Sequence, residues 1–230
     1  MAVPLVACIC PTADRPQFTA EVIGHFLCQD YPVSQCRLLV FDTSAAPCRP
    51  YPLRDDPGHL PDDRVHYWHE TRRPADNVGI LRNRANALAL ELWPETRLFA
   101  HMDSDDYYGP ARLSRQLDLL TASGKAVAGF ATAKFTDGEN WWKYLGTPTY
   151  ALGASLLYQV DWWRTHPFPS LQIGEDNVWT REAWNAGQLL RTDACADLLP
   201  RRTEGDLLIV RCHAGNTDKK VPRNDWMALR

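Results

Sequence analysis

The chain has 230 residues, of which 45% are hydrophobic and 23% are charged, and its formal net charge is −3. This length and apolar content are typical of one large α/β domain and short for two. The slightly acidic balance excludes a global basic field that recruits nucleic acid, and no apolar run approaches the roughly 18 residues of a membrane span.

Strand-like and helical patterns alternate in the first half of the chain. Continuous apolar runs indicate strands that are covered on both faces, and apolar residues recurring at spacings of three and four indicate helices. Such alternation predicts βαβ units and a parallel sheet, whose ligands bind outside the carboxyl ends of the strands. We expect strands at residues 5–10, 37–42, 65–68 and 98–102, and helices at 18–28, 78–92 and 111–121.

The texture changes from Ala126 onward, where strand-like segments predominate. No repeat, low-complexity segment or linker separates the two halves, so we expect a single domain over residues 1–230. The helix predicted in this half ends at Gly187, which suits a C-terminal cap. Strands are expected at 126–135, 141–144, 155–160 and 207–211, and the helix at 177–186.

Three carboxylates follow the fourth predicted strand within four residues, at Asp103, Asp105 and Asp106. Carboxylates this close repel one another, and a hard divalent cation would compensate them while leaving positions for substrate phosphates. An acidic surface turn is the alternative for an isolated D-x-D pattern. Asp14 and Asp42 also follow predicted strands, and this shared placement favours a binding site at one edge of the sheet.

Six short motifs succeed one another over residues 4–190. They are Val6–Arg15, Gln29–Pro32, Val40–Ser44, Leu81–Asn86, Asp103–Asp106 and Gly174–Asp176. In this order they resemble the opening strand and loop, the Q-x-Y-P turn, the V-D-D-G-S element, the R-N-x-x helix start, the D-x-D-D metal motif and the E-D pair of family 2 glycosyltransferases with the GT-A fold. Ala13, Asp14 and Phe41 depart from the family pattern, and Phe41 leaves the contact to the nucleotide base to Asp42 alone.

The resemblance implies a fold and a reaction. The fold would be α/β, a GT-A-type single domain with a mostly parallel, Rossmann-like sheet flanked by helices and a smaller mixed sheet on the acceptor side. Residues 1–125 would bind the nucleotide sugar, and residues 126–230, with a basic C-terminal tail, would bind the acceptor. The reaction would be an inverting, hexosyltransferase-type transfer from a nucleotide-diphosphate sugar, with a UDP-sugar favoured, to a hydroxyl acceptor.

Metal and phosphate chemistry would fall to the acidic loop. A departing diphosphate accumulates negative charge, which Mn²⁺ or Mg²⁺ would stabilise. We expect Asp105 to bind the metal directly and Asp103 to be a second ligand or a ribose contact. Asp106 would ligate or orient water, and Ser104 would contact the donor. Some members of this fold return a C-terminal histidine to the metal, which makes His213 a third candidate ligand; a structural histidine is the alternative.

Further donor contacts are expected from the strand ends and from a helix. Pro11 belongs to the first loop, which would border the base, together with Asp14 and Arg15; these two charged residues alternatively pair with each other. Asp42 would hold the base or ribose, or act as a helix cap or turn residue. Arg82 would contact the diphosphate or the donor sugar, and a solvated helix position is its alternative.

The acceptor side carries the predicted general base. By resemblance, Asp176 would take the proton of the acceptor hydroxyl, and Glu175 would shape the site; alternatively both simply begin a helix, where the macrodipole favours them. Aromatic rings stack on sugars, and Trp142 (or its neighbour Trp141) and Trp179 are the candidates. In the tail, the basic side chains would close over the diphosphate or be solvated; they are Lys219, Lys220 and Arg223.

Competing functions remain open at this stage. A nucleotidyltransferase also places carboxylates at strand ends, but it usually needs a Gly-rich first loop, and Pro11–Pro16 contains no glycine. A non-catalytic sugar-nucleotide-binding module would tolerate the loss of Asp176. The acceptor is open between a small sugar, a glycan terminus, a protein side chain and a modified nucleic-acid base. Seven cysteines without paired short spacing favour reduced thiols over a zinc site, and we expect a cytoplasmic protein.

Overall fold

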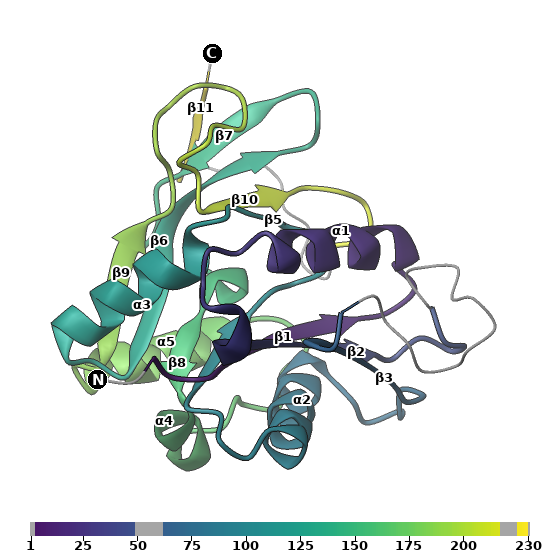
Figure 1. Cartoon of the computed structure of the whole chain (residues 1–230). Coiled ribbons are helices and arrows are strands. Elements are labelled where there is room, and N and C mark those ends of the chain that lie inside the picture. Colours follow the sequence, from purple (N-terminus) through teal and green to yellow (C-terminus); the bar gives the residue numbers. More distant parts are fainter. Residues whose placement is uncertain (1–2, 49–61, 217–224, 230) are drawn as a thin grey trace.

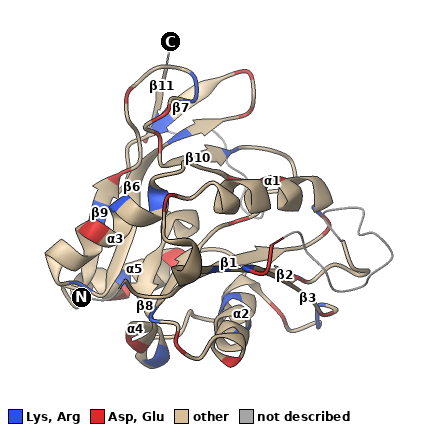
Figure 2. Cartoon of the chain, viewed as in Figure 1, with Lys and Arg blue, Asp and Glu red and all other residues tan. Residues whose placement is uncertain are grey.

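The computed structural model describes residues 3–48, 62–216 and 225–229 (Figure 1). The basic tail residues predicted to close over the diphosphate lie outside these ranges. In the described part of the chain, no helix is long and apolar enough to cross a membrane. Acidic and basic residues are interspersed over the described elements (Figure 2).

Four parallel strands form the half of the sheet that the apolar runs predict. They are β1 (Val6–Thr12), β2 (Cys36–Asp42), β3 (Val65–His69) and β4 (Leu98–His101), in the order β3-β2-β1-β4. The carboxyl ends of β1, β2 and β4 therefore meet at one edge of the sheet, which brings the loops after them together.

Helices cover both faces of this sheet because successive side chains of a strand point to opposite faces. Val6, Cys8 and Cys10 of β1 pack on the side of α1 (Pro16–Leu27) and α3 (Arg112–Ser123). Ala7 and Ile9 pack on the side of α2 and α5. The bounds of these two helices are Val78–Leu92 and Glu175–Asn185. Figure 1 shows α1 and α2 on opposite sides of β1 and β2.

Local chemistry explains where the two site-bearing helices begin and end. The side chain of Asn77 caps α2 by accepting the Ile80 N–H at 3.1 Å. Beyond α5, Gly187 adopts φ +71°. Its N–H donates to the Trp184 carbonyl and the next N–H donates to the Ala183 carbonyl, which is the glycine-dependent ending predicted for this helix.

The second half of the chain extends the same sheet with mixed pairing. Strand β8 (Leu157–Gln159) pairs antiparallel with β4 and with the long β6 (Val127–Thr136), and β6 pairs antiparallel with β7 (Trp141–Tyr144). The predicted α/β, GT-A-type fold class is therefore confirmed, although the mixed part continues the parallel sheet and is not the smaller part. Strands β9 (Leu189–Asp193) and β10 (Leu208–Arg211) pair with β6. Strand β5 (Tyr107–Tyr108) pairs with β10, and β11 (Trp226–Ala228) pairs with β7.

Several short elements were absent from the sequence prediction. These are β5, β9, β11, the helix α4 (Val160–Thr165) and the 3₁₀ turns at Val33–Gln35 and Gly153–Ser155. The strand predicted at 155–160 is shorter than expected, because a 3₁₀ turn precedes it and α4 follows it. The short strands β5, β9 and β11 are held by pairing with distant segments, which a local pattern does not encode.

Candidate active site

A cleft of about 640 Å³ lies at the carboxyl ends of the parallel strands. The loops after β1, β2 and β4 form one side of it, and the N-termini of α2 and α5 form the other. The predicted site residues that line it include Pro11, Arg15, Arg82, Asp103, Asp105 and Asp176. Positions far apart in sequence therefore converge. Of the aspartates that follow predicted strands, Asp103 and Asp105 line the cleft, whereas Asp14 and Asp42 do not.

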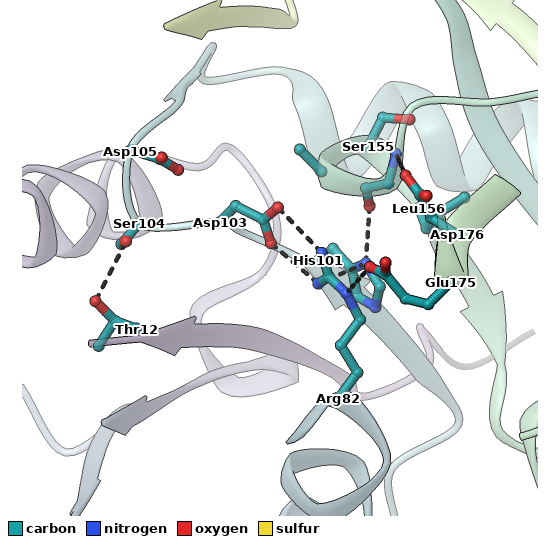
Figure 3. Close-up of polar contacts among 12 residues, drawn as sticks. Thr12, Arg82, His101, Asp103, Ser104, Asp105, Ser155, Leu156, Glu175 and Asp176 are labelled. Atoms are coloured by element: carbon teal, nitrogen blue, oxygen red, sulfur yellow. Dashed lines mark hydrogen bonds and ion pairs between the residues drawn. The ribbon is translucent and has the colours of Figure 1, made fainter. Parts of the chain in front are cut away.

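Arg82 connects the two sides of the cleft. Its guanidinium donates two hydrogen bonds to Asp103, at 3.0 and 3.2 Å, and one to Glu175 at 3.2 Å (Figure 3). Arg82 is only 5% exposed. Burial opposes its charged form, but the Asp103 and Glu175 carboxylates outweigh burial and raise the pKa of Arg82. It is thus a buried link between the acidic loop and α5 and not a solvated helix residue.

Glu175 is the buried member of this network. Burial raises the pKa of Glu175, whereas the neighbouring Arg82 charge lowers it and the Asp176 charge raises it further. The hydrogen bond from Arg82 fixes the position of the Glu175 side chain. The predicted role of Glu175 in shaping the acceptor site would depend on this bond.

Asp105 is held by three side chains, which come from the loop after β1 and from the loop after β10. One of its oxygens, Oδ2, accepts hydrogen bonds from Arg15 at 2.8 Å, from His213 Nε2 at 2.9 Å and from Asn216 at 3.1 Å. Arg15 also donates to the Gly215 carbonyl. The pairing of Arg15 is therefore with Asp105 and not, as the alternative reading had it, with Asp14.

A divalent cation would find two protein ligands here. Asp105 and His213 lie side by side, whereas both oxygens of Asp103 face the Arg82 fork, so the predicted three-residue set does not converge in this structure. Within the described ranges, no group of three histidine, cysteine, aspartate or glutamate side chains is arranged to hold a metal. Cations of the Mg²⁺ type are commonly held by one or two protein ligands plus substrate phosphates, which fits this pair.

Asp106 and Ser104 are buried residues that hold the acidic loop in place. Asp106 is 2% exposed and accepts the Arg211 N–H at 3.0 Å, which ties the acidic loop to β10, the strand that leads to His213. Ser104 is 1% exposed, and its hydroxyl accepts from Thr12 (Figure 3). Neither side chain lines the cleft. In this structure Asp106 is therefore not placed at the metal site and Ser104 is not placed at the donor, and both position the loop instead.

The carboxylate oxygens of Asp42 are occupied by hydrogen bonds, mostly from the loop that follows β2. It is fully buried, and its two oxygens accept the Ser44 N–H at 2.9 Å, the Ser44 hydroxyl, the Cys48 N–H at 2.8 Å and the Tyr67 hydroxyl. Burial would raise the pKa of Asp42, but these hydrogen bonds lower it overall. In this structure the expected contact of Asp42 with a nucleotide base is therefore not available, and the turn-residue alternative describes it.

The first loop borders the cleft through its backbone. Pro11 and Ala13 line the cavity, and Thr43 from the β2 loop faces them. Asp14 is an exposed residue outside the cavity lining, with φ +55° and its N–H bonded to the Ser44 hydroxyl at 2.7 Å. The nucleotide contact expected from the Asp14 side chain is not formed by this geometry.

Asp176 lies across the cleft from the acidic loop, in the first turn of α5. Its Oδ2 accepts the Tyr150 hydroxyl at 2.7 Å and the Gly153 N–H at 3.1 Å, and its Oδ1 accepts the Asn177 N–H at 2.8 Å. Neither Tyr150 nor Gly153 was singled out from the sequence, because nothing local marks them.

The tryptophan predictions need correction. Trp179 is fully buried, stacks on Phe168 with 4.6 Å between ring centroids and donates to the His166 carbonyl, so it belongs to the core and not to an acceptor site. Trp142 does not line the main cleft and packs on Trp226, 5.8 Å between centroids. Trp226 itself lines the cleft and was missed, because the strand that carries it is only three residues long.

Comparison with known proteins gives the fold. No protein-family model matches the chain, and no curated protein matches its sequence. Among solved structures, residues 1–349 of S. aureus TarS in complex with UDP-GlcNAc match 93% of this chain with a TM-score of 0.65 and 16% identity. The mannosyltransferase PcManGT from Pyrobaculum calidifontis, in complex with GDP-Man and Mn²⁺, matches 94% with a TM-score of 0.64 and 16% identity.

The chain spans 60% of that TarS structure and 59% of PcManGT, less than two thirds of either. Identity at this level establishes shared architecture and not shared substrates. The chain therefore has the mixed α/β, GT-A-like fold of these glycosyltransferases.

Proposed function

We propose that this chain is a metal-dependent, inverting glycosyltransferase of the family 2 type. It would transfer a sugar from a nucleotide-diphosphate donor, with a UDP-sugar favoured, to a hydroxyl acceptor. The observation that carries the proposal is one cleft lined by Asp105, which is hydrogen-bonded to His213, and by the Asp176 carboxylate opposite it (Figure 3). The similar folds support it, since TarS is solved with UDP-GlcNAc and PcManGT with GDP-Man and Mn²⁺.

Asp105 and His213 would hold the cation, Mn²⁺ or Mg²⁺. When bound, the ion would stabilise the charge that develops on the departing diphosphate. Imidazole is a softer ligand than carboxylate, which favours Mn²⁺ over Mg²⁺ at this pair. Arg15 contacts the same Asp105 oxygen and is placed to meet the phosphates as a second positive charge.

The protein's own contribution to the chemistry is at Asp176. The acceptor O–H bond breaks and its proton passes to the Asp176 carboxylate, while the acceptor oxygen forms a bond to the anomeric carbon. The bond from that carbon to the diphosphate breaks, and its electron pair leaves with the diphosphate. Because attack comes from the face opposite the leaving group, the anomeric configuration inverts.

Base recognition would rely on the first loop. With Asp42 occupied by Ser44, Cys48 and Tyr67, the contacts to the base fall to the backbone of Pro11–Ala13 and to Thr43. Backbone donors and acceptors can read a base edge without a dedicated carboxylate. Residues 1–125 would thus contribute most of the donor site, and residues 126–230 most of the acceptor site.

The substitution Asp176→Asn tests this proposal. Nucleoside diphosphate released from UDP-GlcNAc or GDP-Man with Mn²⁺ is measured, with water or a sugar alcohol as acceptor. We expect turnover to fall by about 100-fold or more while donor affinity is retained, because general-base catalysis is worth 10²–10⁴-fold. Asp161→Asn, on the exposed surface of α4, is the matched control.

Normal turnover by Asp176→Asn would exclude this residue as the base. Donor binding without any release of nucleotide by the wild type would favour the non-catalytic binding module.

A further inference from the structure

The two oxygens of Asp176 have unequal surroundings. A carboxylate oxygen offers about two lone-pair sites. On Oδ2 both are used, by the Tyr150 hydroxyl at 2.7 Å and the Gly153 N–H at 3.1 Å. On Oδ1 one is used, by the Asn177 N–H at 2.8 Å. One lone pair therefore remains for a proton, and it is on Oδ1.

We propose that Tyr150 and Gly153 are positioning residues that clamp Oδ2 of Asp176, so that the acceptor proton is received by Oδ1. The inference rests on the proposed function and specifies its base at the level of single atoms. The proton leaves the acceptor hydroxyl and forms the Oδ1–H bond, and the hydroxyl electron pair forms the new glycosidic bond. The clamp remains intact throughout, because Oδ2 takes no part in the transfer.

The size of residue 153 is part of the clamp. A Cβ atom at Gly153 would lie 2.4 Å from Asp176 Oδ2 and 3.0 Å from its Cγ. Gly153 is not among the glycines with positive φ, so the requirement for glycine is one of space and not of backbone conformation. A methyl group there would push the carboxylate away from its two donors.

A buried polar chain fixes the Gly153 backbone from behind. His101 donates from Nδ1 to the Gly153 carbonyl at 2.8 Å, and its Nε2 lies 3.0 Å from the Tyr158 hydroxyl, which in turn accepts from Asn86 at 2.9 Å. Figure 3 shows His101 beside Arg82, below the loop that leads to Ser155. Burial, aided by the Arg82 charge, lowers the pKa of His101 well below its ordinary value. The ring therefore stays neutral and keeps one donor and one acceptor.

Charged and titratable groups of several elements interact with Asp176. Arg82 of α2 and Glu175 of α5 form one neighbouring pair, and the Tyr144 hydroxyl of β7 senses the Asp176 charge from the other side. Burial, then the Asp176 charge, hold the pKa of Tyr150 well above its ordinary value. Tyr150 consequently remains a hydrogen-bond donor over the whole working pH range.

The test is the pH dependence of nucleotide release from UDP-GlcNAc or GDP-Man with Mn²⁺. In Tyr150→Phe the ionised carboxylate loses a donor, so we expect the acid limb of the kcat profile to move to higher pH by about one unit. Gly153→Ala should lower kcat at least about 10-fold with donor KM changed less than about 2-fold, because a displaced catalytic group loses rate more than binding. The controls are Tyr31→Phe, whose hydroxyl bonds the Pro4 carbonyl, and Gly24→Ala, which meets no atom within 4 Å.

The outcomes separate the two proposals. An acid limb that stays in place in Tyr150→Phe, in an enzyme that turns over, overturns the clamp and leaves the proposed function standing. The same result follows if Gly153→Ala is folded and as active as Gly24→Ala. A wild type that releases no nucleotide from any donor overturns the proposed function and the clamp with it.

Discussion

Replacing Arg82 by methionine tests how the two sides of the cleft are joined. The substitution keeps the long apolar stem but removes the three hydrogen bonds to Asp103 and Glu175. The Glu175 side chain is 7% exposed and would be left buried without its partner, whereas the Asp103 side chain is 26% exposed and regains water. Breaking a buried pair by removing one member costs about 3–5 kcal/mol, so we expect a loss of about 3 kcal/mol, mostly at Glu175.

Urea unfolding at pH 7.5 measures this loss of stability. The double variant Arg82→Met/Glu175→Gln should recover a large part of it, because a neutral amide carries no uncompensated charge. Arg164→Met is the control on an exposed pair: its side chain is 58% exposed, that of its partner Asp161 is 88% exposed, and a loss of about 1 kcal/mol or less is expected. If Arg82→Met costs no more than Arg164→Met, or if the double variant recovers nothing, Arg82 does not join the two sides of the cleft.

Two further predictions concern the core and pH. Trp179→Phe should lower the free energy of unfolding by about 1–3 kcal/mol but leave metal-dependent nucleotide binding unchanged, since this side chain packs in the core; lost binding at unchanged stability would contradict its placement. Burial, then the Arg211 charge, lower the pKa of His25 to about 4, so the stability that neutral His25 provides above pH 6.5 is lost as pH falls toward 4. Because the imidazole is partly exposed and solvent screens its charge, His25→Gln should lose about 1 kcal/mol less than the wild type between pH 7 and pH 5 in denaturant titrations. Equal losses would contradict this expectation.

The parallel half of the sheet was predictable because its strands are continuous apolar runs. Once strand order along the chain is known, the physics of parallel sheets places their loops at one edge. Asp105 could therefore be placed at this edge of the sheet from the strand pattern, whereas Asp176 was nominated only through the resemblance to family 2 glycosyltransferases. The same reasoning leaves their partners open.

Pairings between distant parts of the chain were only partly predictable. The approach of His213 to Asp105, 108 positions away, was expected only through the family resemblance. The hydrogen bonds of Arg82 to Asp103 and Glu175 were not predicted. For Asp42 the prediction was wrong. Its position at a strand end suggested a contact with the ligand, but its oxygens accept hydrogen bonds from Cys48 and Tyr67. These outcomes depend on loop conformations that no short pattern specifies.

The aromatic residues show a further limit. Trp179 shares its buried helix face with Ala183, a spacing of four that is also the pattern of a core residue. Trp226 follows a polar segment and gives no periodic signal, yet it lines the cleft. Whether an aromatic ring stacks on a ligand or on the core is decided by tertiary packing.

The proposed function depends on a cation-dependent nucleotide site at Asp105 and His213. Calorimetric titration with UDP, GDP, CDP and dTDP, in Mn²⁺ and in EDTA, tests it most directly with the wild type and Asp105→Asn. We predict that one nucleotide binds tightly in Mn²⁺ and that EDTA or the substitution abolishes this binding, because the ion would bridge the protein and the diphosphate. If no nucleotide binds in a metal-dependent way, or if Asp105→Asn binds as well as the wild type, Asp105 and His213 do not form such a site.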